Sequence, residues 1–139
     1  MSSSFKYLAH TADIRLLAKS ETLPDLFSTC LKGMNELLKP GFCDKIKSRS
    51  ESVKIHISSA DSTILLVNFL SEILTLSYLN STLYCECEST KMTDNEIRSV
   101  LKGEKVDGFD NDIKAVTFHE ADIHVNENGD FETVIVFDI

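Results

Sequence analysis

The residues with the clearest potential for chemistry are two aspartates near opposite ends of the sequence. Asp138 is followed by Ile139, and an ordered terminus would place the Asp138 side chain beside the α-carboxylate of that residue. Adjacent carboxylates repel each other unless a cation neutralises them, and hard cations prefer such oxygen ligands. Asp13 would supply a third ligand if its strand neighboured the last strand. The sequence also allows a simpler alternative, in which Asp13 makes a turn and Asp138 belongs to a frayed end.

Two basic side chains of one segment are further candidates. Lys114 stands near the start of a mostly apolar stretch that His119 ends. A histidine can serve as a general base near neutral pH. Each residue also has an ordinary structural explanation. The lysine stem can lie over apolar surface with its ammonium group in water, and the histidine can simply form hydrogen bonds at a strand end.

Several catalytic classes lack their motifs in this sequence. Gly103 and Gly108 have the glycine spacing of a phosphate-binding loop, but Phe109-Asp110 replaces the lysine and hydroxyl residue that contact phosphate and magnesium. No G-x-S-x-G or H-E-x-x-H motif occurs. The acidic stretch 107–112 lacks the terminal glutamate of a calcium loop, so we interpret it as a solvated turn. Walker-type nucleotide binding, serine hydrolysis and zinc hydrolysis therefore lose support.

Hydrophobic periodicity predicts the elements that position these groups. Apolar residues recur at helical spacing over 23–38, after a Thr22/Asp25 capping pair, and over 62–77, after Asp61. The segment 93–106 fits a short helix or a strand, and its alternation favours a strand. The remaining predicted strands are Asp13–Ser20, 53–58, 83–88, 113–119, 121–125 and 131–138, with the last two forming a hairpin around Asn128-Gly129.

These elements predict an α+β fold. Two main helices would pack on one face of a mostly antiparallel or mixed β-sheet of about six or seven strands, which gives a two-layer sandwich. The chain of 139 residues, with 42% apolar residues, predicts a single domain over 1–139. A chain of this size can bury a core without a disulfide or a structural metal.

The net charge and the distribution of apolar residues limit which partners and which cellular location we expect. The net charge of −8 argues against a basic nucleic-acid-binding surface. Polar residues interrupt the longest apolar stretch, 64–79, and also the N-terminal segment, so we expect no membrane span, no secretory signal and a cytoplasmic protein. A protein in that compartment would keep its cysteines as reduced packing thiols, and their spacing does not suit zinc. The four cysteines are Cys30, Cys43, Cys85 and Cys87.

Four segments, in order along the chain, resemble the archease family. They are HTADI at 10–14, TLPDLF at 22–27, IKAVTFH at 113–119 and VIVFDI at 134–139. The HTADI opening combined with the FDI ending is specific, and the resemblance covers nearly the whole chain. Two positions depart from the family pattern. Ser71 stands where asparagine is expected, and Lys19-Ser20 replaces a glycine before the first helix.

The resemblance implies a function that the residues alone do not. Archeases activate the GTP-dependent tRNA-splicing RNA ligase, by promoting its guanylylation and multiple turnover, and are not ligases themselves. Carried over to this sequence, Asp13 and Asp138 are metal ligands, Ile139 is a metal-contacting terminal position and Lys114 is a functional lysine. The implied ion is Ca²⁺, although Mg²⁺ or Mn²⁺ would also accept oxygen ligands. The implied partner is the ligase, with no stable binding to nucleic acid or membrane.

Two other functions stay open at this point. A small metal-dependent enzyme could use the same carboxylates to activate water for phosphoester hydrolysis. A general chaperone or modulator of other proteins would instead need an exposed apolar patch.

Overall fold

The computed structural model describes residues 2–8 and 13–139, which form three helices and eight strands. The helices are α1 (Leu23–Leu38), α2 (Phe42–Lys45) and α3 (Ser62–Asn80). The strands are β1 (Ser3–Leu8), β2 (Asp13–Ser20), β3 (Glu51–Ser58), β4 (Thr82–Met92), β5 (Glu96–Lys105), β6 (Ala115–Thr117), β7 (His124–Val125) and β8 (Phe131–Asp138).

The strands form two antiparallel sheets. The larger sheet has the order β1-β2-β8-β6, and the short β7 also pairs with β8. The smaller sheet has the order β3-β5-β4. The α+β class and the antiparallel pairing predicted from the sequence are confirmed, but the strands divide between two sheets instead of joining one.

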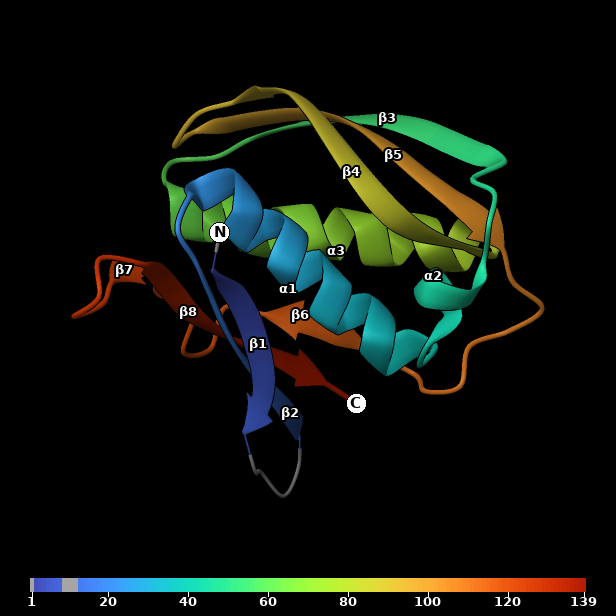
Figure 1. Cartoon of the computed structure of the whole chain (residues 1–139), viewed down its shortest axis with the longest axis horizontal. Coiled ribbons are helices and arrows are strands. Elements are labelled where there is room, and N and C mark those ends of the chain that lie inside the picture. The colour runs from blue at the N-terminus through green and yellow to red at the C-terminus, as the bar shows by residue number, and fades with distance from the viewer. Residues whose placement is uncertain (1, 9–12) are drawn as a thin grey trace.

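The two long helices lie between the sheets (Figure 1). Helix α1 contacts β1, β2 and β8 on one side and β4 on the other, while α3 contacts β6 and all three strands of the smaller sheet. Three layers therefore replace the two-layer arrangement expected from the sequence. The physical reason is that α3 is apolar around most of its circumference, so that a sheet on one side alone would leave apolar surface in water.

Helix α1 has the bounds that its sequence predicts. The hydroxyl group of Thr22 accepts a hydrogen bond from the Asp25 N–H at 3.2 Å, and Pro24 occupies the first turn, where its missing N–H costs nothing. After the helix, Gly41 takes a left-handed φ of +76°. The apolar stripe of the helix is buried, including Leu26, Phe27, Cys30, Met34 and Leu38.

Helix α3 begins as predicted and extends three residues beyond 77, to Asn80. The Asp61 carboxylate caps it by accepting a hydrogen bond from the Ile64 N–H at 2.9 Å. By length and apolarity alone, α3 is a helix that could cross a membrane. Its apolar character has a sufficient explanation in this fold, because residues such as Leu66, Phe69 and Ile73 are fully buried in the shared core.

The strand predicted within 93–106 is confirmed as β5. The capping-like pair Thr93 and Glu96, which made a helix the alternative, closes the β4–β5 turn instead. The Thr93 hydroxyl accepts hydrogen bonds from the N–H groups of Asn95 and Glu96 at 3.2 and 3.0 Å. Such side-chain bonds serve turns as well as helix starts, so the local sequence could not decide between the two.

Several strand limits differ from the sequence prediction. β1 and α2 had no predicted counterpart, and β4 runs on to Met92. β6 and β7 are shorter than the predicted 113–119 and 121–125, because the chain leaves the sheet after Thr117. In the loop between β6 and β7, the Ile123 N–H donates a hydrogen bond to the Thr63 hydroxyl at 3.0 Å, which ties this loop to the start of α3.

Cys43 and Cys85 form a disulfide, so the prediction that all four cysteines are reduced is wrong for this pair. Helix α2 places Cys43 beside β4, with the two Cα atoms 5.6 Å apart. The sequence could not show this contact because 42 positions separate the two residues. Cys30 and Cys87 remain thiols, and burial raises the pKa of Cys30 to about 12.

The contact between β4 and β5 yields a first prediction. An added Cβ at Gly103 would lie 2.1 Å from the Leu83 carbonyl oxygen, so Gly103→Ala must displace backbone. We expect this change to lower the free energy of unfolding by about 1–3 kcal/mol in urea denaturation. Gly108→Ala is the control, because nothing lies within 4 Å of its added Cβ, and equal losses in the two variants would contradict the explanation.

The disulfide yields a second prediction. Without reductant, the unfolded protein should expose two alkylatable thiols, from Cys30 and Cys87, and mass spectrometry should find two additions. Replacing Cys43 and Cys85 together by serine should lower the free energy of unfolding by about 2–4 kcal/mol, since the closed loop no longer restricts the unfolded chain. Four additions to the unfolded parent protein would show that the bond does not form.

Candidate functional site

The register of the larger sheet brings the two candidate aspartates together. Asp13 begins β2 and lies directly opposite Asp138, at the end of β8. Side chains of opposite residues on antiparallel strands share a face, with Cβ atoms about 4.5–5.5 Å apart. The strand adjacency that the sequence could only suppose is therefore confirmed, and neither Asp13 in a turn nor Asp138 in a frayed end describes this structure.

The aspartate pair lies on the outer face of the sheet. Leu16 and Ala18 of β2 are fully buried toward the helices, as is Phe137 of β8. Because successive side chains of a strand alternate between faces, Asp13 and Asp138 point to the opposite, solvent side. Two like charges there are hydrated only in part, because Asp13 is half-buried while Asp138 is exposed.

Lys114 lies next to Asp138 because it directly precedes β6, the strand that pairs with β8. Its N–H donates a hydrogen bond to the Asp138 carbonyl oxygen at 2.7 Å, and the next residue, Ala115, pairs with Asp138 in the β6–β8 register. The Lys114 side chain is exposed. The sheet thus brings Asp13 and Asp138 together on one face, and the backbone bond of Lys114, just before β6, places this lysine beside Asp138. Alternation puts Ala115, not Lys114, on the face of the aspartates. The same pairing holds the backbone that leads to Ile139, whose side chain is 45% exposed.

His119 lies elsewhere. It follows the far end of β6, where its N–H donates to the Thr117 hydroxyl at 3.3 Å, and it is exposed. The length of β6 separates it from Asp138, so the structure does not bring this histidine to the aspartate pair. Residues 10–12 of the HTADI motif lie outside the described residues.

An ion pair beside the aspartates was not foreseen from the sequence. The Arg15 guanidinium donates two hydrogen bonds to the Glu120 carboxylate, both at 2.8 Å. These bonds raise the pKa of Arg15, and the nearby charge of Asp13 adds to the effect. The sequence did contain one indication of a cation near Asp13, because Arg15 follows two residues later and therefore lies on the same face of the strand. Because Glu120 already balances its charge, Arg15 neutralises the aspartate pair only in part.

The residues present fit a hard cation in an open site. Asp13 and Asp138 are carboxylate oxygen donors at one end of the sheet, the donor type that Ca²⁺ and Mg²⁺ prefer. Among residues 2–8 and 13–139, no group of three or more His, Cys, Asp or Glu side chains is placed to hold a metal ion. Since Ca²⁺ takes about six to eight oxygens, water or a partner would have to complete the coordination.

Comparisons with known proteins agree with one another. Residues 5–139 match the family described as the Archease protein family (MTH1598/TM1083). The chain is 28% identical to the protein archease of Methanosarcina mazei, over 97% of this chain and 95% of that protein. The archease of Methanosarcina acetivorans gives the same identity and coverage.

Two solved structures share the fold. The solution structure of protein 1598 of Methanobacterium thermoautotrophicum has a TM-score of 0.77 at 22% identity, covering 97% of this chain and 98% of that one. The crystal structure of an archease from Thermotoga maritima, described as a possible chaperone, has a TM-score of 0.67 at 18% identity, covering 96% of each chain.

The geometry of the site predicts which residues hold a cation. Asp13→Asn and Asp138→Asn should each weaken Ca²⁺ binding at least about tenfold in titration calorimetry, because each removes a charged oxygen ligand from an open site. Lys114→Ala should leave binding intact. Asp107→Asn, an exposed acid of the loop after β5, is the matched control. Unchanged affinity in both aspartate variants would rule out these ligands.

Proposed function

Because the chain belongs to the archease family, we propose that it is a non-catalytic, metal-binding activator of the GTP-dependent tRNA-splicing RNA ligase. In this role it promotes guanylylation of the ligase and allows multiple turnover during tRNA splicing. The description of the Thermotoga relative as a possible chaperone likewise points to a protein partner. The proposal includes the cytoplasmic location expected from the sequence.

One observation carries this proposal: Asp13 lies opposite Asp138 at the end of β2 and β8, and the Lys114 N–H donates to the Asp138 carbonyl oxygen at the same end of the sheet. A cation held by the two aspartates and the terminal carboxylate of Ile139 would supply a positive charge for oxygen ligands of a partner. The Lys114 ammonium group would add a second, mobile charge next to it, for a nucleotide phosphate or an acidic ligase residue. We therefore propose that this end of the molecule contacts the active site of the ligase.

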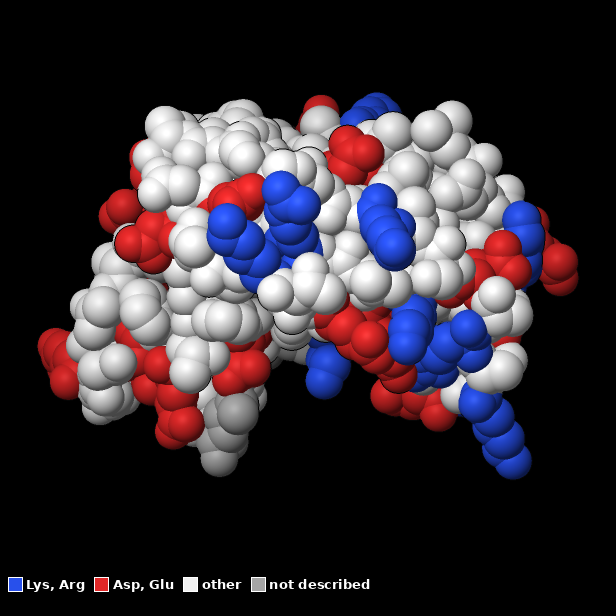
Figure 2. All heavy atoms as spheres, turned by 90° about the horizontal axis from the view of Figure 1, so that it is seen from above, with Lys and Arg blue, Asp and Glu red and all other residues white. Residues whose placement is uncertain are grey.

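The charge distribution supports a protein partner over direct RNA binding. Figure 2 shows the outer side of the smaller sheet, where Lys and Arg side chains are interspersed with Asp and Glu. Many of these cations are paired there. Lys102 contacts Glu88 at 3.1 Å, and both Lys91 and Arg98 contact Glu96, at 2.8 and 3.4 Å. A protein with a net charge of −8, several of whose basic groups are paired with acids, suits a basic RNA-binding enzyme better than RNA itself.

The decisive test is ligation by a matching ligase under multiple-turnover conditions. Asp138→Ala and Lys114→Ala should each remove most of the stimulation of ligase guanylylation, because one weakens cation binding and the other removes the adjacent charge. Lys47→Ala, at an exposed lysine between α2 and β3, should stimulate like the parent protein. Circular dichroism and urea unfolding would verify that all three variants are folded.

Full stimulation by both folded site variants would mean that another surface serves the ligase. Hydrolysis of a phosphoester by the pure protein, lost in Asp138→Ala, would instead favour the metal-dependent hydrolase. Protection of unrelated unfolding proteins from aggregation, with no effect on the ligase, would favour a general chaperone.

A further inference from the structure

A second candidate site, a cleft, opens at the end of the larger sheet opposite to the aspartate pair. The register pairs Asp13 with Asp138 at one end of β2 and β8, and Ser20 with Phe131 at the other. The cleft lies beside Phe131, between the two sheets and at the starts of α1 and α3, and its volume is about 440 Å³. It shares no lining residue with the proposed cation site.

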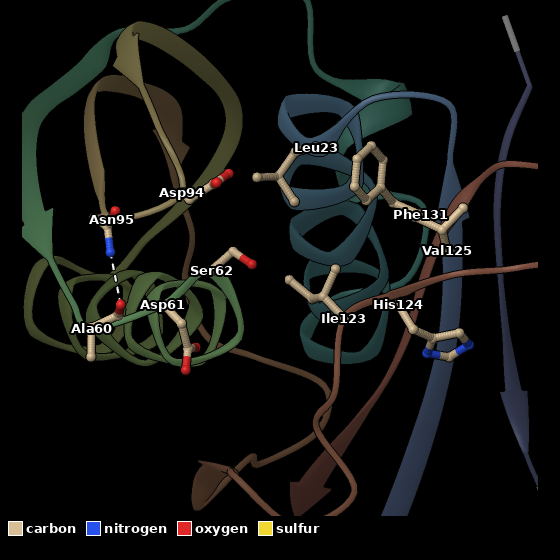
Figure 3. Close-up of a pocket in the computed structure, with 10 residues that line it drawn as sticks. All are labelled: Leu23, Ala60, Asp61, Ser62, Asp94, Asn95, Ile123, His124, Val125 and Phe131. Carbon is tan, nitrogen blue, oxygen red and sulfur yellow. Dashed lines mark hydrogen bonds between the residues drawn. The ribbon is translucent and has the colours of Figure 1, made fainter.

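The two walls of this cleft differ in chemistry (Figure 3). One wall is apolar and consists of Leu23, Ile123, Val125 and Phe131. The other carries Ser62 and the two acids Asp61 and Asp94. In Figure 3, Leu23 and Ile123 point into the gap from one side, while the Ser62 hydroxyl and the Asp94 carboxylate point into it from the other.

The polar wall is held rigidly. The Asn95 side-chain amide donates hydrogen bonds to the carbonyl oxygens of Ser59 and Ala60, at 3.2 and 2.7 Å, and so ties the β4–β5 turn to the segment before α3. The Ser59 N–H returns a bond to the Asn95 carbonyl oxygen at 2.8 Å. Asp94 stands at the tip of this turn, and its carboxylate forms no hydrogen bond or ion pair with another described residue.

None of the described residues that line the cleft is a lysine or arginine. One Asp61 oxygen caps α3, and its carboxylate points away from the gap in Figure 3. His124 also belongs to the lining, but its ring is turned away from the gap in Figure 3 and lies 3.2 Å from Glu132. Within the described part of the chain, the cleft therefore presents an apolar wall opposite the Asp94 carboxylate, with a second acid, Asp61, at its edge.

We propose that this cleft holds an arginine or lysine side chain of a partner protein. The apolar stem of such a side chain would lie against Leu23 and Ile123, while its charged head would reach Asp94, with Asp61 adding negative charge at the edge of the cleft. A protein segment suits the site better than a free small molecule, because six of the lining residues are exposed, including Val125 at 59%. Sites for small ligands are usually more enclosed. The inference does not depend on the proposed ligase function.

The test uses short capped peptides and amide chemical shifts of the ¹⁵N-labelled protein. The probe is acetyl-Leu-Arg-Leu-amide, with acetyl-Leu-Gln-Leu-amide to remove the charge and acetyl-Gly-Arg-Gly-amide to remove the apolar groups. Spermidine represents a free polyamine. We expect the first peptide to shift the amides of Ser62, Asn95 and Ile123 saturably, and the other probes to bind more weakly.

The variants isolate the charge of the polar wall. Asp61→Asn keeps the helix cap, because asparagine caps as well as aspartate, and Asp94→Asn keeps a turn whose hydrogen bonds do not use that carboxylate. The Kd of the arginine peptide should rise about three- to tenfold in the double variant, as expected for the loss of an exposed ion pair and of a second negative charge near it. Asp107→Asn, beyond the opposite end of β5, should leave the Kd unchanged.

Three results would overturn the inference. They are the absence of saturable shifts at these amides, equal binding of the Arg and Gln peptides, and an unchanged Kd in the double variant. Tighter binding of spermidine at the same amides would show that the cleft binds a free polyamine and not a side chain of a partner protein. Because no ligase is present in these titrations, their failure would leave the proposed function untouched.

Discussion

The pairing register of β2 with β8 is the constraint on which the two functional features depend. It places Asp13 opposite Asp138 at one end and Ser20 opposite Phe131 at the other. A slip of one residue would turn the buried side chains of a strand to solvent, so the core on the inner face fixes the register strongly. Residues such as Leu16 and Phe137, which have no catalytic chemistry, thereby determine where the carboxylates lie.

The position of α3 between two sheets determines the overall architecture. A helix that is apolar on nearly all sides must be enclosed, and here one sheet lies on each side of the helix layer. The outer faces of both sheets are then left to water, and they carry the charged groups. The same arrangement leaves the space between the two sheets open at its ends, and the cleft lies at one of these ends. The aspartate pair lies on the outer face of the larger sheet, at the other end of β2 and β8.

The two sites are both acidic, but they differ in what they can bind. The Asp13–Asp138 end offers adjacent oxygen donors on an outer sheet face, an arrangement that favours a compact hard cation. The cleft at the opposite end sets the Asp94 carboxylate opposite Leu23 and Ile123, an arrangement that favours a long cationic side chain with an apolar stem. With a net charge of −8, the whole molecule also attracts basic partners over longer distances.

Features that depend on near neighbours could be predicted from the amino-acid sequence: the helices starting at Leu23 and Ser62, through their caps and periodicity, and the strand β5. It also identified the residue types of the aspartate site, whose adjacency it could only suppose. Tertiary structure decided the division into two sheets, the Cys43–Cys85 bond, the Arg15–Glu120 ion pair and the cleft. Each of these joins segments far apart in the chain, and periodicity reports which face of an element is buried without reporting what covers it.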